Sequence, residues 1–134
     1  MPSGIEKDEY LDASANMRTY INMRFAQLTL FVALTAGFLT LLVGRANPLS
    51  GTASAGLKVG GILIAVVFWV MEERAADFFH YYKRRAVELE KILGYSQYTN
   101  RPQRRVLAAT NAVRLLFLGA VILWLLALFH PSFS

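Results

Sequence analysis

Apolar residues concentrate in three stretches of the chain, residues 25–43, 59–71 and 115–129, which carry almost no charge. A helix that crosses the hydrocarbon core of a bilayer needs about 20 predominantly apolar residues. The first stretch nearly meets this length, and the other two reach it with small or amphipathic neighbours, residues 53–58 and 106–113. The pattern therefore predicts an all-α integral membrane protein with three transmembrane helices.

The second stretch has no stop signal at its end. No Pro or Gly occurs from Ile62 to Leu93, so one long helix is expected to leave the membrane and continue into the cytoplasm as a stalk. Gly94 is a typical residue just beyond a helix end. The stalk has a heptad-like seam with alternating intervals of four and three residues: Ala75, Phe79, Tyr82, Ala86, Leu89 and Leu93.

Helical spacing also precedes the first span, and it predicts an amphipathic N-terminal helix that runs into this span. Ser3 and Glu6 fit a capping box at its start. The beginning of this helix is acidic whereas the stalk is basic, so antiparallel packing of the two would bring opposite charges together. Exposed pairs contribute only about 0.2–1 kcal/mol each, so they set register more than stability. The spaced residues are Tyr10, Ala13, Met17, Tyr20 and Arg24.

The chain is expected to form a single membrane domain with six consecutive parts. Turn formers and small residues between the first two spans predict a short external loop. The parts are an N-terminal helix (3–24), a first span (25–43), an external loop (44–56), a second span with its stalk (57–93), a cytoplasmic loop (94–105) and a third span (106–130).

Composition supports the membrane interpretation. Of the 134 residues, 55% are hydrophobic and 17% charged, against about a quarter charged in soluble domains. A soluble protein with three buried helices is the alternative, but so small a chain cannot surround them with polar helices. A cleaved signal peptide is not expected, because the first apolar stretch follows an acidic segment instead of a short basic one.

The distribution of Lys and Arg predicts the orientation. The linker between the first two spans holds only Arg45 and Lys58, whereas eight basic residues lie between the second and third. The positive-inside rule then places the N-terminus and the stalk in the cytoplasm and the C-terminus outside. Anionic lipid headgroups are the expected partners of these charges, and no nucleic acid is needed to explain a pI near 9.8.

Polar residues at membrane depth are the first candidates for function. Arg114 and Asn111 fall within the third span, and an intramembrane Arg usually has a partner because insertion costs about 2.5–3.5 kcal/mol. Glu73 and Asp77 lie at a compatible depth, so a contact with Arg114 would couple the last span to the stalk. The alternative is that Arg114 reaches the cytoplasmic headgroups along its own flexible stem.

A basic cluster with aromatic neighbours is expected at the cytoplasmic surface. It could bind a phosphate-bearing ligand, but anchoring to lipid headgroups is the favoured interpretation. The residues are Arg101, Arg104 and Arg105, with Tyr95, Tyr98 and His80. No cysteine, metal-ligand spacing, phosphate-binding glycine loop or catalytic dyad occurs, so neither an enzyme nor a cofactor is predicted.

Small residues at i, i+4 spacing permit close approach of helices in lipid. Packing within one chain is favoured over a dimer face. The positions are Gly56 and Gly60, Gly61 and Ala65, and Ala33 and Gly37.

Residues 68–77 and the Tyr82–Gly94 segment, which is rich in Arg and ends in Leu-Glu-x-x-Leu-Gly, resemble small bacterial membrane proteins of SLATT-like type. The resemblance covers the first two spans and the stalk, and it implies a membrane effector that oligomerises into a pore. The third span departs from the two-span plan of such proteins, and the resemblance assigns no site residues.

The predicted function is that of a non-enzymatic inner-membrane protein that forms homo-oligomers, with a pore or channel as one outcome. A pore should have polar residues facing one axis, whereas Thr29, Thr35 and Thr40 do not all share one stripe. A scaffold or accessory subunit of a larger membrane complex is the alternative. A membrane-tethered sensor of a phosphate-bearing ligand is the third.

Overall fold

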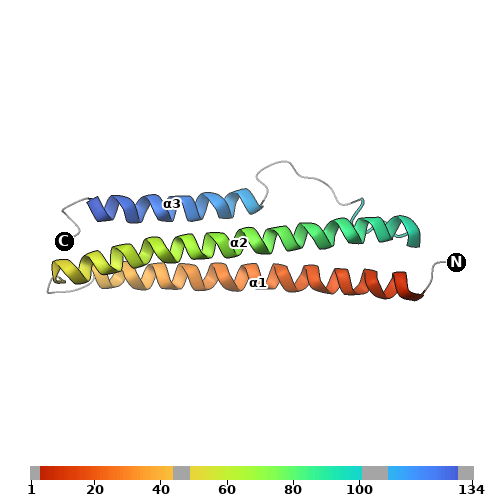
Figure 1. The fold of residues 1–134 in the computed structure, drawn as a ribbon, viewed down its shortest axis with the longest axis horizontal. Helices are drawn as coiled ribbons and strands as arrows, with labels where there is room; N and C mark the ends of the chain where they lie inside the picture. The colour runs from red at the N-terminus through yellow and green to blue at the C-terminus, as the bar shows by residue number, and fades with distance from the viewer. Residues whose placement is uncertain (1–3, 44–48, 101–108, 130–134) are drawn as a thin grey trace. The chain divides into compact units, whose positions relative to one another are not determined.

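The computed structural model describes residues 4–43, 49–100 and 109–129, which form three helices (Figure 1). These are α1 (Gly4–Val43), α2 (Gly51–Leu93) and α3 (Ala109–Phe129). Of the described residues, 92% are helical and none is in a strand, so the all-α prediction is confirmed. Each helix contains a stretch long and apolar enough to cross a membrane. The chain is therefore compatible with a multi-pass membrane protein.

Two of the helices are much longer than a bilayer requires. Helix α1 has 40 residues and α2 has 43. At 1.5 Å per residue they are about 60 and 65 Å long, roughly twice the thickness of the hydrocarbon core. The N-terminal segment and the first span are one uninterrupted helix, and the second span continues through the stalk in the same way.

The start of α2 differs from the prediction. The external loop was expected to extend to Gly56, but α2 begins at Gly51. The hydroxyl of Ser50 accepts a hydrogen bond from the backbone N–H of Ala53 at 3.3 Å, and its carbonyl accepts one from Ser54 at 2.9 Å. Ser50 is thus an N-cap, which satisfies orphan amides and outweighs the turn preference of the small residues behind it.

The ends of the other predicted parts lie partly outside the described residues. Helix α3 occupies Ala109–Phe129 of the predicted third span, residues 106–130. Residues 44–48 of the external loop and residues 101–105 of the cytoplasmic loop are not described.

Contacts within the chain form two compact units. We call Met1–Phe25 with Glu72–Val106 the stalk unit, and Ala26–Met71 with Leu107–Ser134 the span unit. The divisions fall next to Phe25 and Met71, where the first predicted span begins and the apolar stretch of the second ends. The change from apolar to charged sequence therefore coincides with a change of packing partners.

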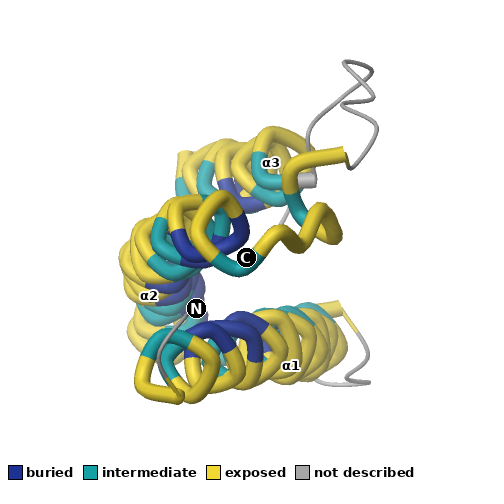
Figure 2. The backbone as a smooth tube through the Cα atoms, turned by 90° about the vertical axis from the view of Figure 1, so that its right-hand side faces the viewer, coloured by how far each residue is buried: buried dark blue, intermediate teal, exposed yellow. Residues whose placement is uncertain are grey.

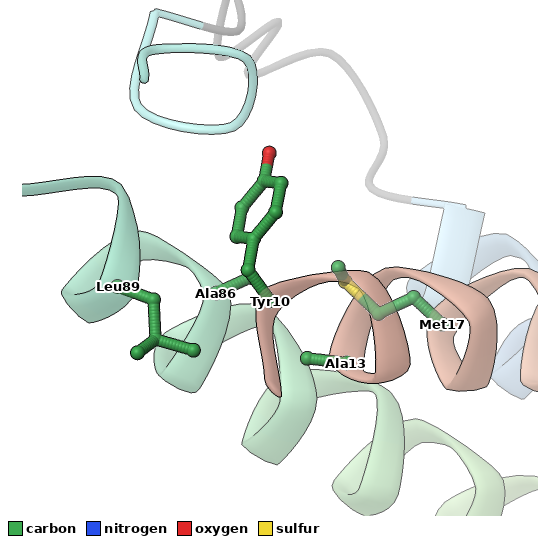
Figure 3. Packing of buried hydrophobic residues seen from close by; sticks show 5 residues of the cluster. All are labelled: Tyr10, Ala13, Met17, Ala86 and Leu89. Atoms are coloured by element: carbon green, nitrogen blue, oxygen red, sulfur yellow. The ribbon is translucent and has the colours of Figure 1, made fainter. Parts of the chain in front are cut away.

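In the stalk unit, α1 and α2 pack against each other as antiparallel helices. The core contains Tyr10, Ala13 and Met17 from α1 and Ala86 and Leu89 from α2, all at most 5% exposed (Figure 3). Small residues on both sides allow the helices to approach closely. All six residues of the predicted seam are buried or partly buried, so the seam packs within one chain.

The span unit has an aromatic core to which all three helices contribute. The Phe31 ring of α1 lies 4.8 Å from Phe117 of α3 and 5.6 Å from Phe68 of α2, centroid to centroid. Ala65 is fully buried beside them. Most other residues of the three helices are exposed, and they are the yellow parts of the backbone tube in Figure 2. Apolar exposure of this extent suits a lipid environment.

Candidate functional site

The most completely bonded polar group of the stalk unit is the Glu90 carboxylate, which is 0% exposed. It accepts hydrogen bonds from the backbone N–H groups of Tyr98 (2.8 Å) and Thr99 (2.9 Å) and from the Thr99 hydroxyl (2.6 Å). The Tyr10 hydroxyl of α1 donates a fourth at 3.1 Å. We call these residues the Glu90 clamp. Through these hydrogen bonds, the segment with Tyr98 and Thr99 is held against α1 and α2 of the stalk unit.

The pKa values of the Glu90 clamp follow from this geometry. Burial raises the pKa of the Glu90 carboxyl, but the hydrogen bonds from Thr99 and Tyr98 outweigh burial and hold the pKa below its usual range. Burial and the adjacent Glu90 carboxylate raise the pKa of Tyr10 to about 12. Glu90 is therefore a saturated structural anion, unsuited to proton transfer near neutral pH.

A glycine allows the chain to turn toward this carboxylate. Gly94 has a φ of 74°, which is favourable for Gly and strained for other residues. The N–H groups of Gly94 and Tyr95 both donate to the Glu90 carbonyl, at 2.9 and 3.1 Å, and close the last turn of α2. The Gly94 helix stop predicted from the sequence is confirmed.

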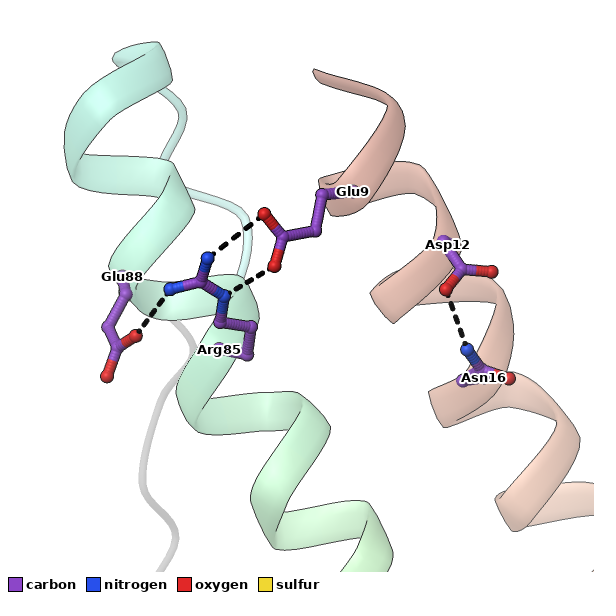
Figure 4. A network of polar contacts seen from close by, with 5 residues as sticks. All are labelled: Glu9, Asp12, Asn16, Arg85 and Glu88. Carbon is purple, nitrogen blue, oxygen red and sulfur yellow. Dashed lines mark hydrogen bonds and ion pairs between the residues drawn. The ribbon is translucent and has the colours of Figure 1, made fainter. Parts of the chain in front are cut away.

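A second polar network joins the outer faces of α1 and α2 (Figure 4). The Arg85 guanidinium donates to both Glu9 carboxylate oxygens, at 2.6 and 3.0 Å, and to Glu88 at 3.2 Å. The hydrogen bond from Arg85 holds the pKa of the Glu9 carboxyl below its usual range. These side chains are 42–61% exposed, so this network sets register and adds little stability.

A buried ion pair closes the other end of the stalk unit. The guanidinium of Arg24 in α1 donates to Oε1 of Glu72 in α2, with Nε at 2.8 Å and Nη2 in a second contact. The Glu72 side chain is 4% exposed and that of Arg24 is 17% exposed. Such a pair is sensitive to the loss of either partner, because the remaining charge is left buried.

The sequence contained a signal for this pair. Glu72 lies three residues before Ala75 and extends the 4–3 spacing of the stalk seam, and Arg24 ends the apolar spacing of the N-terminal helix. A charged residue at a seam position becomes buried between the helices, so an opposite charge is expected at a seam position of the partner helix. Neither Glu72 nor Glu90 was among the predicted site residues.

The predicted coupling of Arg114 remains a prediction. Arg114 and Asn111 are exposed residues of α3 in the span unit, whereas Glu73 and Asp77 belong to the stalk unit. Both Arg114 and Glu73 take part in polar or electrostatic interactions.

In the span unit, aromatic rings pack directly against some of the predicted small residues. A Cβ on Gly61 would lie 2.3 Å from the Trp124 indole of α3, which is 0% exposed. A Cβ on Gly60 would lie 3.2 Å from the Phe38 ring of α1. Together with the buried Ala65, these glycines bring α1 and α3 against α2. They act within one chain.

The other small residues face outward. Ala33, Gly37 and Gly56 are exposed, and a Cβ on either glycine would meet nothing within 4 Å. These positions are open to contacts with lipid or with another helix.

The basic cluster predicted at Arg101, Arg104 and Arg105 lies outside the described residues. Of its neighbours, Tyr95 and Tyr98 pack their rings on Tyr10, and His80 is exposed on α2. The described part of the chain holds no group of three or more His, Cys, Asp or Glu side chains that could bind a metal ion.

Comparisons with known proteins give no relative: no family model, no curated protein and no solved structure matches this chain. The resemblance to SLATT-like proteins therefore stays a prediction. Function must be argued from the packing and the charges of the chain itself.

Proposed function

We propose that the protein is a non-enzymatic multi-pass membrane protein that self-associates within the bilayer through an exposed face of the α1 span. The charge distribution supports an orientation with the stalk unit in the cytoplasm of a bacterial cell and the C-terminus outside. The partner is a second copy of the same chain.

One observation carries this proposal. The α1 span exposes a line of small residues that we call the α1 stripe: Ala26, Thr29, Ala33, Ala36 and Thr40, at alternating intervals of three and four, with Gly37 beside them four residues after Ala33. The opposite face of the same span packs Phe31, Leu34 and Phe38 inside the chain. Small side chains let helix backbones approach closely in lipid, where packing drives association.

The stalk gives a second argument. Its seam already packs against α1 of the same chain, and the Glu90 clamp and the Arg24–Glu72 pair satisfy buried charges internally. Self-association through the stalk would require another face of these helices. The α1 stripe, in contrast, is exposed and can contact a second copy without any change in the packing of the chain.

The α1 stripe favours packing over a water-filled pore. The Thr40 hydroxyl donates to the carbonyl of Ala36 at 2.9 Å, so its own helix satisfies this polar group. The second candidate is an accessory subunit whose α1 stripe packs on a different membrane protein. It is supported by the packing of the stalk unit, whose seam and buried charges find their partners within one chain and need no second copy.

Matched substitutions on two spans test the proposal. Gly37→Leu fills the α1 stripe, whereas Gly119→Leu makes the same change on α3, and both positions have open space around them. Native mass spectrometry in mild detergent should show an oligomer for the natural protein and for Gly119→Leu, and mainly monomer for Gly37→Leu.

A monomeric natural protein would overturn self-association and leave the accessory subunit. An oligomer that withstands Gly37→Leu would move the interface away from the α1 stripe. Ion flux from liposomes that contain the natural protein then tests the pore directly, and the packing argument predicts no flux above that of empty liposomes.

A further inference from the structure

A cavity of about 270 Å³ opens on the stalk unit, bounded by α1, α2 and the segment that the Glu90 clamp holds. Its volume is close to the lower end of the range for small-molecule sites. We call it the basic pocket, and the residues around it include Met17, Arg18, Phe79, Lys83, Gln97 and Tyr98.

The charges of the basic pocket have one sign. Arg18 of α1 and Lys83 of α2 contribute two cations, and no Asp or Glu lines the cavity. Among the described residues, the ion pairs involve neither of these two side chains. Arg and Lys together offer the planar and the point-like donors that phosphate oxygens accept.

The uncharged walls of the pocket are formed in advance. Met17 is 2% exposed in the core of the stalk unit, and Phe79 and Tyr98 pack against that core. The Glu90 carboxylate fixes Tyr98 through its backbone N–H at 2.8 Å. A site whose walls are already ordered loses less entropy when a ligand binds.

The depth of the pocket suits a ligand at the membrane surface. Arg18 lies six residues before Arg24, or about 9 Å along α1. With the hydrocarbon core beginning at Phe25, the headgroup layer extends about 5–8 Å from it, so the Arg18 backbone lies just outside this layer and its flexible side chain can reach into it. Both the phosphate of an anionic lipid and a soluble phosphate ester reach this depth.

We propose that the basic pocket binds a phosphate-bearing ligand, with Arg18 and Lys83 on the phosphate and Phe79 and Tyr98 beside the rest of the molecule. This proposal does not depend on self-association. The sequence interpretation placed such a ligand at Arg101, Arg104 and Arg105, whereas the described cavity uses cations from two different helices.

Two probes distinguish a lipid from a soluble ligand. Calorimetric titration of the protein in phosphatidylcholine nanodiscs with inorganic pyrophosphate measures the soluble arm. Native mass spectrometry of the phosphatidylglycerol retained from mixed nanodiscs measures the lipid arm. The test variant is Arg18→Gln/Lys83→Gln, and the control is Lys7→Gln/Lys91→Gln, which removes the same charge from exposed positions outside the pocket.

In at least one arm, the test variant should bind about tenfold more weakly or worse, while the control changes by less than about twofold. The arm that responds identifies the source of the phosphate. Unaltered circular dichroism shows that the variants fold, and the single change Arg18→Gln, at an exposed side chain, repeats the test with less risk to folding. No binding in either arm, or an equal loss in test and control variants, overturns the proposal.

Discussion

The stalk unit and the span unit share the two long helices α1 and α2, and the span unit adds α3, but different interactions stabilise the two units. In the stalk unit, buried polar groups lie among small apolar residues, as the Glu90 clamp and the Arg24–Glu72 pair show. In the span unit, aromatic rings sit on glycines and on one another, as for Trp124 on Gly61.

The difference fits the proposed surroundings of each unit, with the stalk unit in water and the span unit in lipid. In water, apolar burial drives the helices together, and buried polar pairs specify which residues face each other. In lipid there is no hydrophobic gain between helices, so close packing of shapes decides the arrangement. Along one long helix, residues spaced by three and four therefore form two kinds of interface: one with buried polar pairs in the stalk unit and one with closely packed rings and glycines in the span unit.

Loss of the Glu72 carboxylate should be the largest perturbation of the stalk unit. Glu72→Ala leaves the Arg24 guanidinium without this partner in a buried position, at an expected cost of about 3–5 kcal/mol. The double change Arg24→Met/Glu72→Met should recover most of that stability. Chemical unfolding in detergent, followed by circular dichroism, measures both, and a single variant as stable as the natural protein would show that the pair is not buried in solution.

Removal of the Glu90 carboxylate should have the next largest effect. Glu90→Leu deprives the N–H groups of Tyr98 and Thr99 of their acceptor, which costs about 1–3 kcal/mol for a buried donor. Hydrogen exchange at these two amides should rise. Glu88→Leu is the matched control, since the Glu88 side chain is 61% exposed and should change stability by less than about 0.5 kcal/mol.

The same carboxylate makes the stalk unit sensitive to acid. Because the pKa of Glu90 is lower in the folded chain than its ordinary value of 4.5, its stabilisation is present above pH 4.5 and disappears as the pH falls toward the folded pKa. Tyr10 adds stabilisation that is lost as the pH rises through about 12. The free energy of unfolding, measured at several values between pH 3 and 7, should change less with pH for Glu90→Gln than for the natural protein. An identical pH dependence in both proteins would exclude Glu90 as the cause.

In the span unit, a single methyl group should suffice to disturb packing. Gly61→Ala places a Cβ against the Trp124 indole and should cost about 1–3 kcal/mol through overpacking. Gly37→Ala, where the space is open, should be neutral or stabilising because Ala favours helix. The midpoints of thermal unfolding of the two variants are compared in the same detergent. Equal midpoints would show that the Trp124 indole does not pack closely on Gly61.

The exposed Arg85–Glu9 pair should have the smallest effect. Glu9→Gln removes one charge from a pair whose side chains are more than 40% exposed, so only a small loss of stability is expected. The loss should shrink further at high salt. A salt-independent loss of several kcal/mol would mean that this pair, like Arg24–Glu72, is shielded from water.

The sequence predicted the helices and the continuation of the second span into a charged stalk, because both depend on local spacing and charge. It predicted the stalk seam for the same reason. It did not identify the acceptor role of Glu90, since a contact with residues eight and nine positions further along the chain depends on how the segment after Gly94 folds back. The Arg24–Glu72 pair depends on the register between two helices, and the basic pocket combines residues from three segments.

The central claim is that the stalk seam closes within one chain while the α1 stripe remains available to a second copy. The chain has no cysteine, so Ala13→Cys/Ala86→Cys introduces one unique pair in the core of the stalk unit. After thiol cross-linking in native membranes, a non-reducing gel should show an internally linked monomer, and Ala33→Cys alone should give a covalent dimer. Covalent dimers joined through Ala13→Cys and Ala86→Cys, with no internal link, would contradict the account.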